Sequence, residues 1–150
     1  MNTNDVRPLK RAVSLVLRND SGEFLIVKRP NSATDDLAGV WGFPAVQLID
    51  EESEIDGAYR CGRAKLGVDV ILGQKIGEST HERPSQILTL SDYEATLARD
   101  NVPIVPQPDT TLIQYEACIF THDYTLLYPA ARKGSQCTQI FLESVGADWR

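Results

Sequence analysis

Histidine and cysteine, two of the side chains that most often hold transition metals, are scarce in this sequence. The chain has two histidines, His81 and His122, and three cysteines, Cys61, Cys118 and Cys137, all widely separated. No two of them have the close spacing of a zinc site. An odd number of scattered cysteines also argues against a disulfide framework, so we expect a reducing compartment, the cytoplasm.

An excess of positive charge and long apolar runs are also lacking. Fifteen lysines and arginines are outnumbered by 21 acids, which gives a formal net charge of −6. Because the chain has no broad basic patch, we expect no nucleic-acid partner. No apolar run reaches the length of a membrane span, and the N-terminus has no secretory pattern, so we expect no membrane association.

The composition that remains is that of an ordinary globular protein. With 42% apolar and 24% charged residues, the chain can bury a core and is neither disordered nor membranous. Its 150 residues suit one domain. We therefore expect a single domain over residues 1–150, in which the polar residues 1–10 form a loosely held lead.

Alternation of apolar and polar residues predicts several strands. They are expected at 11–18, 24–28, 69–79, 87–97 and 112–121. Turn residues at 19–22 make the first two a hairpin, and Gly73 and Gly77 indicate bends or bulges in the third. A turn is expected at 80–85, and a stiff loop at 99–110, which has three prolines. In the last strand, the residues expected to face inward are Ile113, Tyr115, Ala117 and Ile119.

Two segments have apolar residues at helical spacing. The first begins near Glu54, because Ser53 followed by Asp56 makes a capping-box-like start, and it ends at Gly67. Its expected core face comprises Ile55, Ala58, Tyr59, Gly62 and Leu66. The second helix is expected within 134–145, with Cys137, Ile140, Phe141 and Val145 on one face. Periodicity alone predicts an α+β or α/β fold.

The segment 41–68, WGFPAVQLIDEESEIDGAYRCGRAKLGV, resembles the signature of the Nudix superfamily of nucleoside-diphosphate-X pyrophosphohydrolases. The matching residues are Glu52 for the isolated Glu of the Nudix box, Arg60 for its Arg, Gly67 for its closing Gly and Val68 for the final aliphatic. WGFP at 41–44 is the usual lead-in. The resemblance implies an α/β fold, a Nudix-type α/β/α sandwich with a mixed central sheet that covers nearly the whole chain.

Several box positions depart from the family pattern. They are Ala45 and Val46 for two glycines, Gly62 for an aliphatic, Cys61 for the Glu after the Arg, and Ala64 and Lys65 for the later Glu pair. In the family these acids meet on one helix face and hold Mg²⁺ or Mn²⁺, hard cations that prefer oxygen ligands. The same face of this chain has no oxygen ligand, so we expect no metal cofactor.

The remaining box residues suggest a structural pair and an anion site. Glu52 and Arg60, with Gly67, resemble the family's brace between loop and helix. Lys65 has the position that faces the family's cleft, where its ammonium could hold a phosphate or carboxylate directly. Arg63 and Trp41 are further candidates for ligand binding, with a solvated helix face and core packing as the respective structural alternatives.

Four residues are candidates for catalysis: Glu52, Cys61, Glu82 and Glu94. Cys61 lies among basic residues, a setting that can lower a thiol pKa, although it could simply fill the space of the lost Glu. Glu82 and Glu94 come from neighbouring strands and, with Glu78 and Asp92, could form a displaced carboxylate cluster. Solvent-facing strand acids are the structural alternative.

We therefore expect a Nudix-fold protein that binds a small anionic, phosphorylated or nucleotide-like ligand without Mg²⁺-dependent hydrolysis. One alternative is an atypical hydrolase of a nucleoside-diphosphate-like substrate, with Mg²⁺ or Mn²⁺ held by displaced acids. Another is a protein-interaction module with a vestigial cleft. The sequence also leaves open whether the protein forms a homodimer.

Overall fold

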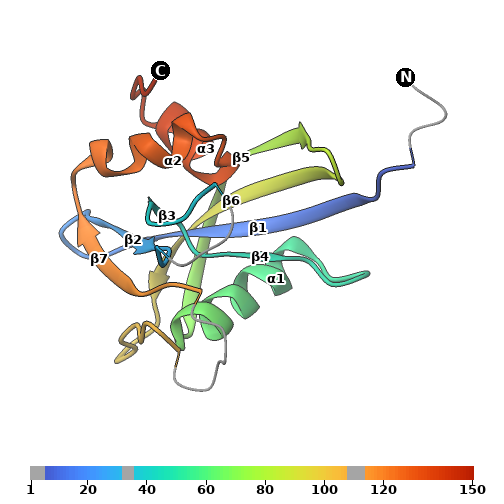
Figure 1. Ribbon diagram of the computed structural model, residues 1–150. Coiled ribbons are helices and arrows are strands. Elements are labelled where there is room, and N and C mark those ends of the chain that lie inside the picture. Colours follow the sequence, from blue (N-terminus) through green and yellow to red (C-terminus); the bar gives the residue numbers. More distant parts are fainter. Residues whose placement is uncertain (1–5, 32–35, 108–113) are drawn as a thin grey trace.

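A mixed β-sheet forms the centre of the molecule (Figure 1), for which a computed structural model describes residues 6–31, 36–107 and 114–150. The described strands are β1 (Leu9–Arg18), β2 (Phe24–Lys28), β3 (Trp41–Gly42), β4 (Ala45–Gln47), β5 (Val70–Glu82), β6 (Ile87–Leu97) and β7 (Ala117–Thr121). β1 runs parallel to β6 and antiparallel to β2 and β4. β5 and β7 pair with β6 and β2 at the two outer sides of the sheet.

Helices cover both faces of this sheet. They are α1 (Glu54–Cys61) with the π-helical turn η1 (Gly62–Leu66), the 3-10 turn η2 (Tyr124–Leu127), α2 (Tyr128–Arg132) and α3 (Gln136–Ser144). Figure 1 shows α1 on one side of the sheet and α2 and α3 on the other. The α/β/α sandwich predicted from the sequence is therefore confirmed. No described helix is long and apolar enough to cross a membrane.

Strand alternation divides the core into two clusters, because successive side chains of a strand point to opposite faces. From β1, Val13 and Leu15 pack on the α1 side, in the cluster that contains Leu66. Val16 packs on the opposite side against the cluster around Phe141 of α3. Burial of side chains of this size stabilises the fold by about 1.5–3 kcal/mol each. We call these sides the α1 face and the α3 face.

The box helix begins where the sequence predicts. Ser53 Oγ accepts a hydrogen bond of 3.0 Å from the backbone N–H of Asp56, which satisfies a donor of the first turn. After Cys61 the helix widens into η1, where a Cβ on Gly62 would lie 3.1 Å from the Val68 carbonyl oxygen. Gly67 ends the segment with φ of 65°, a left-handed conformation that favours glycine.

Some expected elements need correction. The prediction of a turn at 80–85 is wrong for its first residues, because β5 continues to Glu82. The turn that follows is closed by the backbone N–H of Arg83, which donates to Gln86 O. Part of the expected loose lead belongs to the sheet, since β1 begins at Leu9. The helical turns η2 and α2 were not predicted. Register shifts between Leu72 and Gly77 confirm the bulges expected at the β5 glycines.

Two inward faces also differ from expectation. Ile55 is 53% exposed, contrary to expectation, whereas Ala58 and Leu66 of the same predicted face are fully buried. The last strand begins only at Ala117, and its inward residues are Cys118 and Phe120, which leaves Ile119 41% exposed. Tyr115 is buried as expected, although it precedes the strand. Ile113 lies outside the described residues.

Candidate functional site

The helix face that corresponds to the Nudix metal site presents no carboxylate. Cys61 is fully buried in the α1-face core, and burial raises the pKa of its thiol to about 12. The thiol therefore stays protonated and is neither a metal ligand nor a nucleophile at neutral pH. Ala64 is exposed and Lys65 is half-buried. This donor set does not fit Mg²⁺ or Mn²⁺, and no three His, Cys, Asp or Glu side chains gather anywhere in the described ranges.

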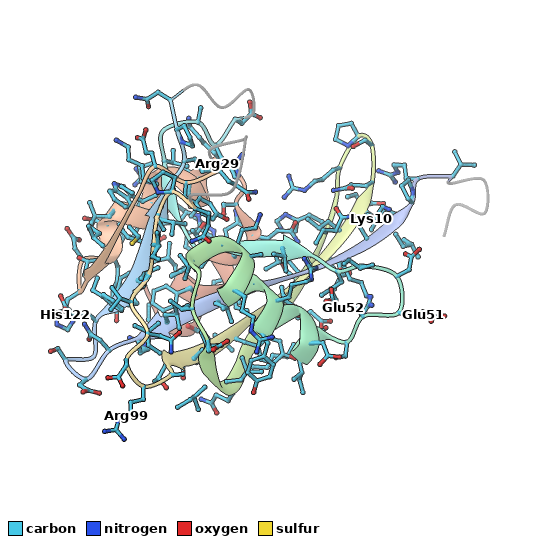
Figure 2. The ribbon with its side chains drawn as sticks, turned by 90° about the horizontal axis from the view of Figure 1, so that it is seen from below. Lys10, Arg29, Glu51, Glu52, Arg99 and His122 are labelled. Atoms are coloured by element: carbon cyan, nitrogen blue, oxygen red, sulfur yellow. The ribbon has the colours of Figure 1, made fainter. Side chains whose placement is uncertain are left out.

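Glu52 and Arg60 contact each other across the loop and the helix. Arg60 Nε donates to Glu52 Oε2 at 2.9 Å, and Nη2 donates to Oε1 at 2.8 Å and to Gln47 O at 2.8 Å. Hydrogen bonding from Arg60 lowers the pKa of Glu52 to about 2. Figure 2, viewed from the α1 side, shows Glu52 beside the start of α1. Because Glu52 also accepts from Ile49 N, it has the contacts of a brace.

Lys65 contacts an amide instead of a carboxylate. Its Nζ donates to Gln114 Oε1, and no salt bridge to Lys65 occurs among the residues that the structure describes. Burial lowers the pKa of Lys65, and the positive charges of Arg60 and Arg29 lower it further. Lys65 thus lies in a cationic environment in which an anion would be attracted.

The other two ligand candidates lie differently. Arg63 is turned outward and pairs with Asp69 at 2.7 Å, with both side chains more than half exposed. Trp41 packs against the α3-face core and is half-buried. Arg63 therefore lies on a solvated helix face and Trp41 packs on the core, which are the structural alternatives to ligand binding.

The four acids of the displaced cluster are kept apart by separate partners. Glu82 pairs with Arg7 at 3.1 Å, and Glu94 pairs with Arg18 at 3.7 Å. Asp92 is buried on the α3 face, where Ser14 Oγ donates to its Oδ1. Its Oδ2 has no partner in the described chain, and burial raises the pKa of Asp92 to about 8.

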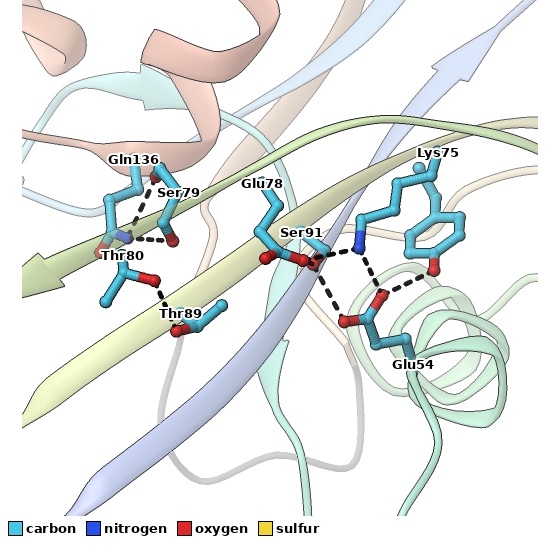
Figure 3. A network of polar contacts seen from close by, with 9 residues as sticks. Glu54, Lys75, Glu78, Ser79, Thr80, Thr89, Ser91 and Gln136 are labelled. Carbon is cyan, nitrogen blue, oxygen red and sulfur yellow. Dashed lines mark hydrogen bonds and ion pairs between the residues drawn. The ribbon is translucent and has the colours of Figure 1, made fainter.

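Glu78 belongs to a polar network on the α1 face (Figure 3). Lys75 Nζ donates to Glu78 at 2.7 Å and to Glu54 at 3.1 Å. Glu54 also accepts from Tyr93 Oη at 2.7 Å and from Ser91 Oγ at 3.1 Å. Burial alone would raise the pKa of Glu54, but the hydrogen bonds from Tyr93, Lys75 and Ser91 outweigh it and the pKa is lowered. An ammonium therefore occupies the point where these carboxylates meet.

A cavity of about 200 Å³ opens on the α3 face, between the sheet and the start of α3. Apolar side chains such as Phe43 and Leu90 form much of its wall, and none of the described residues that line it is acidic. Its polar side chains are Arg29, Arg83, Gln114, Tyr115, Ser135, Gln136 and Cys137. A concave, mostly apolar site with a few polar groups is typical of small-molecule binding.

Long-range hydrogen bonds fix two polar residues of this wall. Gln136 is 2% exposed, and its Nε2 donates to Ser79 O at 3.2 Å and to Leu88 O at 3.1 Å. Its Oε1 accepts from Arg83 Nη2 at 2.9 Å. Sequence reasoning missed both residues because they are 53 positions apart and belong to no motif. Only the fold brings the β5–β6 turn to the start of α3.

Comparison with known proteins places the fold. No family model matches this sequence, and no curated protein is significantly similar to it. A NUDIX hydrolase from Nitrosomonas europaea has a TM-score of 0.67 at 15% identity, over 93% of this chain and 89% of its own. The E. coli ORF135 protein has a TM-score of 0.65 at 22% identity, over 91% of both chains. The MutT protein from Methanosarcina mazei Go1 has 0.61 at 19% identity, over 78% of this chain and 79% of its own. The chain therefore has the Nudix fold that segment 41–68 predicts.

Proposed function

We propose that this protein binds a small anionic, phosphorylated or nucleotide-like ligand through its own cations, without the Mg²⁺-dependent hydrolysis that the Nudix resemblance implies. The observation that carries the proposal is the replacement of the box carboxylates: Lys65 lies half-buried on the expected metal face, and Cys61 is a buried, protonated thiol. A lysine ammonium attracts a phosphate directly.

The cavity supports the same proposal. Gln114, whose side-chain oxygen accepts from Lys65, also lines the cavity, so the ammonium and the cavity wall are joined through one side chain. Arg29 lines the same region and acts electrostatically on Lys65. Since no described lining residue is acidic, an anion entering the cavity meets no carboxylate among the described residues of its wall.

Binding is tested by titration calorimetry with phenyl phosphate in the presence of EDTA. Wild-type protein should bind, and Lys65→Met should weaken binding about ten- to a hundredfold, the equivalent of about 1.5–3 kcal/mol for a hydrogen bond to a charged group. Lys133→Met is the matched control, because Lys133 is exposed beyond α2. Equal affinity of wild type and Lys65→Met would contradict the assignment of Lys65.

Hydrolysis is tested separately with ADP-ribose and nucleoside triphosphates in the presence of Mg²⁺ or Mn²⁺. We expect no turnover above a buffer control, because the box helix offers no carboxylate cluster to hold the metal. Robust metal-dependent turnover that survives further purification and disappears in Glu52→Gln would replace this proposal with the atypical hydrolase.

A further inference from the structure

The cavity on the α3 face has cationic groups on two opposite sides. On one side Arg29 follows β2, and Gln114 comes from the segment before β7, the strand that pairs with β2. On the other side Arg83 comes from the turn between β5 and β6. β1 separates β2 from β6 in the sheet, so the two sides lie apart.

Arg83 is held in place but keeps free donor groups. Its Nη2 donates to Gln136 Oε1 at 2.9 Å and to Gly134 O at 3.4 Å, both uncharged acceptors. No carboxylate pairs with Arg83, and its Nε and Nη1 make no hydrogen bond, within the described ranges. A guanidinium has five N–H donors and stays charged at any pH relevant here. The guanidinium of Arg83, held in one orientation, therefore offers unused N–H groups at the cavity wall.

The hydrogen bonds of Gln136 show that the orientation of Arg83 is preformed. Its amide group is tied to Ser79 and Leu88 of two strands (Figure 3 shows the contacts with Ser79), so the oxygen that orients Arg83 cannot rotate away without breaking them. The start of α3 lines the same wall, and its N-cap Ser135 makes no side-chain capping bond. The partial positive charge of this helix end adds to that of Arg83.

We infer that the cavity takes a small molecule with two anionic ends joined by a short apolar body. One anion is held by Arg83 beside the start of α3. The other is held on the opposite side by Gln114, behind which Lys65, itself outside the cavity lining, donates to the Gln114 side-chain oxygen. Phe43, Leu88 and Leu90 pack on the body between them. At about 200 Å³ the cavity is smaller than the roughly 300–1,000 Å³ of typical ligand pockets, which fits one small ring and not an extended dinucleotide. This inference rests on the proposed function, whose anion is the one at Lys65.

Two probes that differ only in the second anion test the inference. Phenyl phosphate has one charged end, and 4-carboxyphenyl phosphate has the same ring with a carboxylate at the far end. Calorimetry with wild-type protein in EDTA should show that the carboxylated probe binds at least tenfold more tightly, because the carboxylate reaches the unused donors of Arg83. In Arg83→Met this gain should vanish, so that the two probes bind with equal affinity.

The controls separate this inference from the function on which it rests. Arg99→Met is the matched control, since Arg99 is exposed and lies outside the cavity lining. If wild type binds both probes equally, the second anion site is wrong while the proposed function stands. If wild type binds neither probe, both are wrong. The wild-type comparison decides the question even if Arg83→Met does not fold, and Arg83→Lys, which keeps the charge but not the fork, should retain only part of the gain.

Discussion

The α1 face and the α3 face of the sheet differ in how they accommodate charge. On the α1 face Glu52 pairs with Arg60, and Glu54 and Glu78 share Lys75. On the α3 face Arg18 pairs with Glu94, but Asp92 is buried beside Ser14 without a cation. The Arg83 guanidinium there has only uncharged partners in the described chain. The pKa values follow this difference, since that of Glu52 is lowered to about 2 and that of Asp92 raised to about 8.

This difference separates charges that stabilise the fold from charges that are available to a ligand. Charges that compensate each other within the protein have little left to offer a ligand, and they hold loops and strands in register. A guanidinium beside a cavity without a neighbouring carboxylate keeps its attraction for an outside anion. The paired charges of the α1 face therefore suit a scaffold, and we propose the α3 face for the ligand, with Lys65 and Gln114 linking the two.

The largest effect is expected from Asp92→Asn. Folding raises the pKa of Asp92 from 3.8 to about 8, so its contribution to stability is present below pH 4 and is lost as pH rises toward 8. The slope is at most about 1.4 kcal/mol per pH unit, or up to about 4 kcal/mol between pH 5 and pH 8. Urea denaturation at several pH values should show this loss in wild type and a much flatter profile in the variant. Parallel profiles for the two proteins would show that Asp92 does not titrate in this range.

Arg60→Ala should have the next largest effect, because it removes a two-bond ion pair and leaves Glu52 without its main partner. We expect a fall in Tm of about 5 °C at pH 7. Arg63→Ala removes an exposed ion pair from the same helix and should change Tm by less than about 2 °C. Because the pKa of Glu52 is about 2, the Arg60 effect is present above pH 4.5 and should shrink as pH falls toward 2. Equal Tm shifts for the two variants would remove the distinction between brace and surface pair.

The smallest effect is expected from Lys75→Met. Lys75 and Glu78 are both at least one-third exposed, so solvent screens their pair and the stability loss should stay below about 1 kcal/mol. The sharper readout is the pKa of Glu54, which should rise when Lys75 is removed, because two carboxylates then face each other. Carboxyl-detected NMR titration measures it, and an unchanged Glu54 pKa would mean that Tyr93 and Ser91 alone keep it low.

The sequence predicted the features that depend on neighbouring residues. Ser53 starts α1, Gly67 ends η1, and the alternation at 11–18 and 87–97 marks two strands of the sheet, β1 and β6. Widening of the helix into η1 was not predicted, because it depends on the close approach of Gly62 to Val68 and Val70, a tertiary contact. Helix α2 was missed because it is only five residues long and has a proline in its first turn.

The candidate site was predictable only in part, for the same reason. The box comparison pointed to Glu52 in the loop and to Arg60 and Lys65 on the helical segment, because their spacing is visible in the sequence. Arg83 and Gln136 become neighbours only when α3 packs across β5 and β6, and no local pattern signals that contact. The displaced carboxylate cluster looked plausible from strand positions, but Glu78 contacts Lys75 on the α1 face and Asp92 contacts Ser14 on the α3 face, as strand alternation requires.

The central claim is that cations of the chain itself, and not a bridging metal, hold the ligand. Calorimetric titration of wild-type protein with 4-carboxyphenyl phosphate, once in EDTA and once in excess Mg²⁺, tests it most directly. Binding in EDTA with an affinity equal to or greater than that in Mg²⁺ is the result predicted here, since free Mg²⁺ would only compete for the phosphate. Binding that appears only with added Mg²⁺ would contradict the claim.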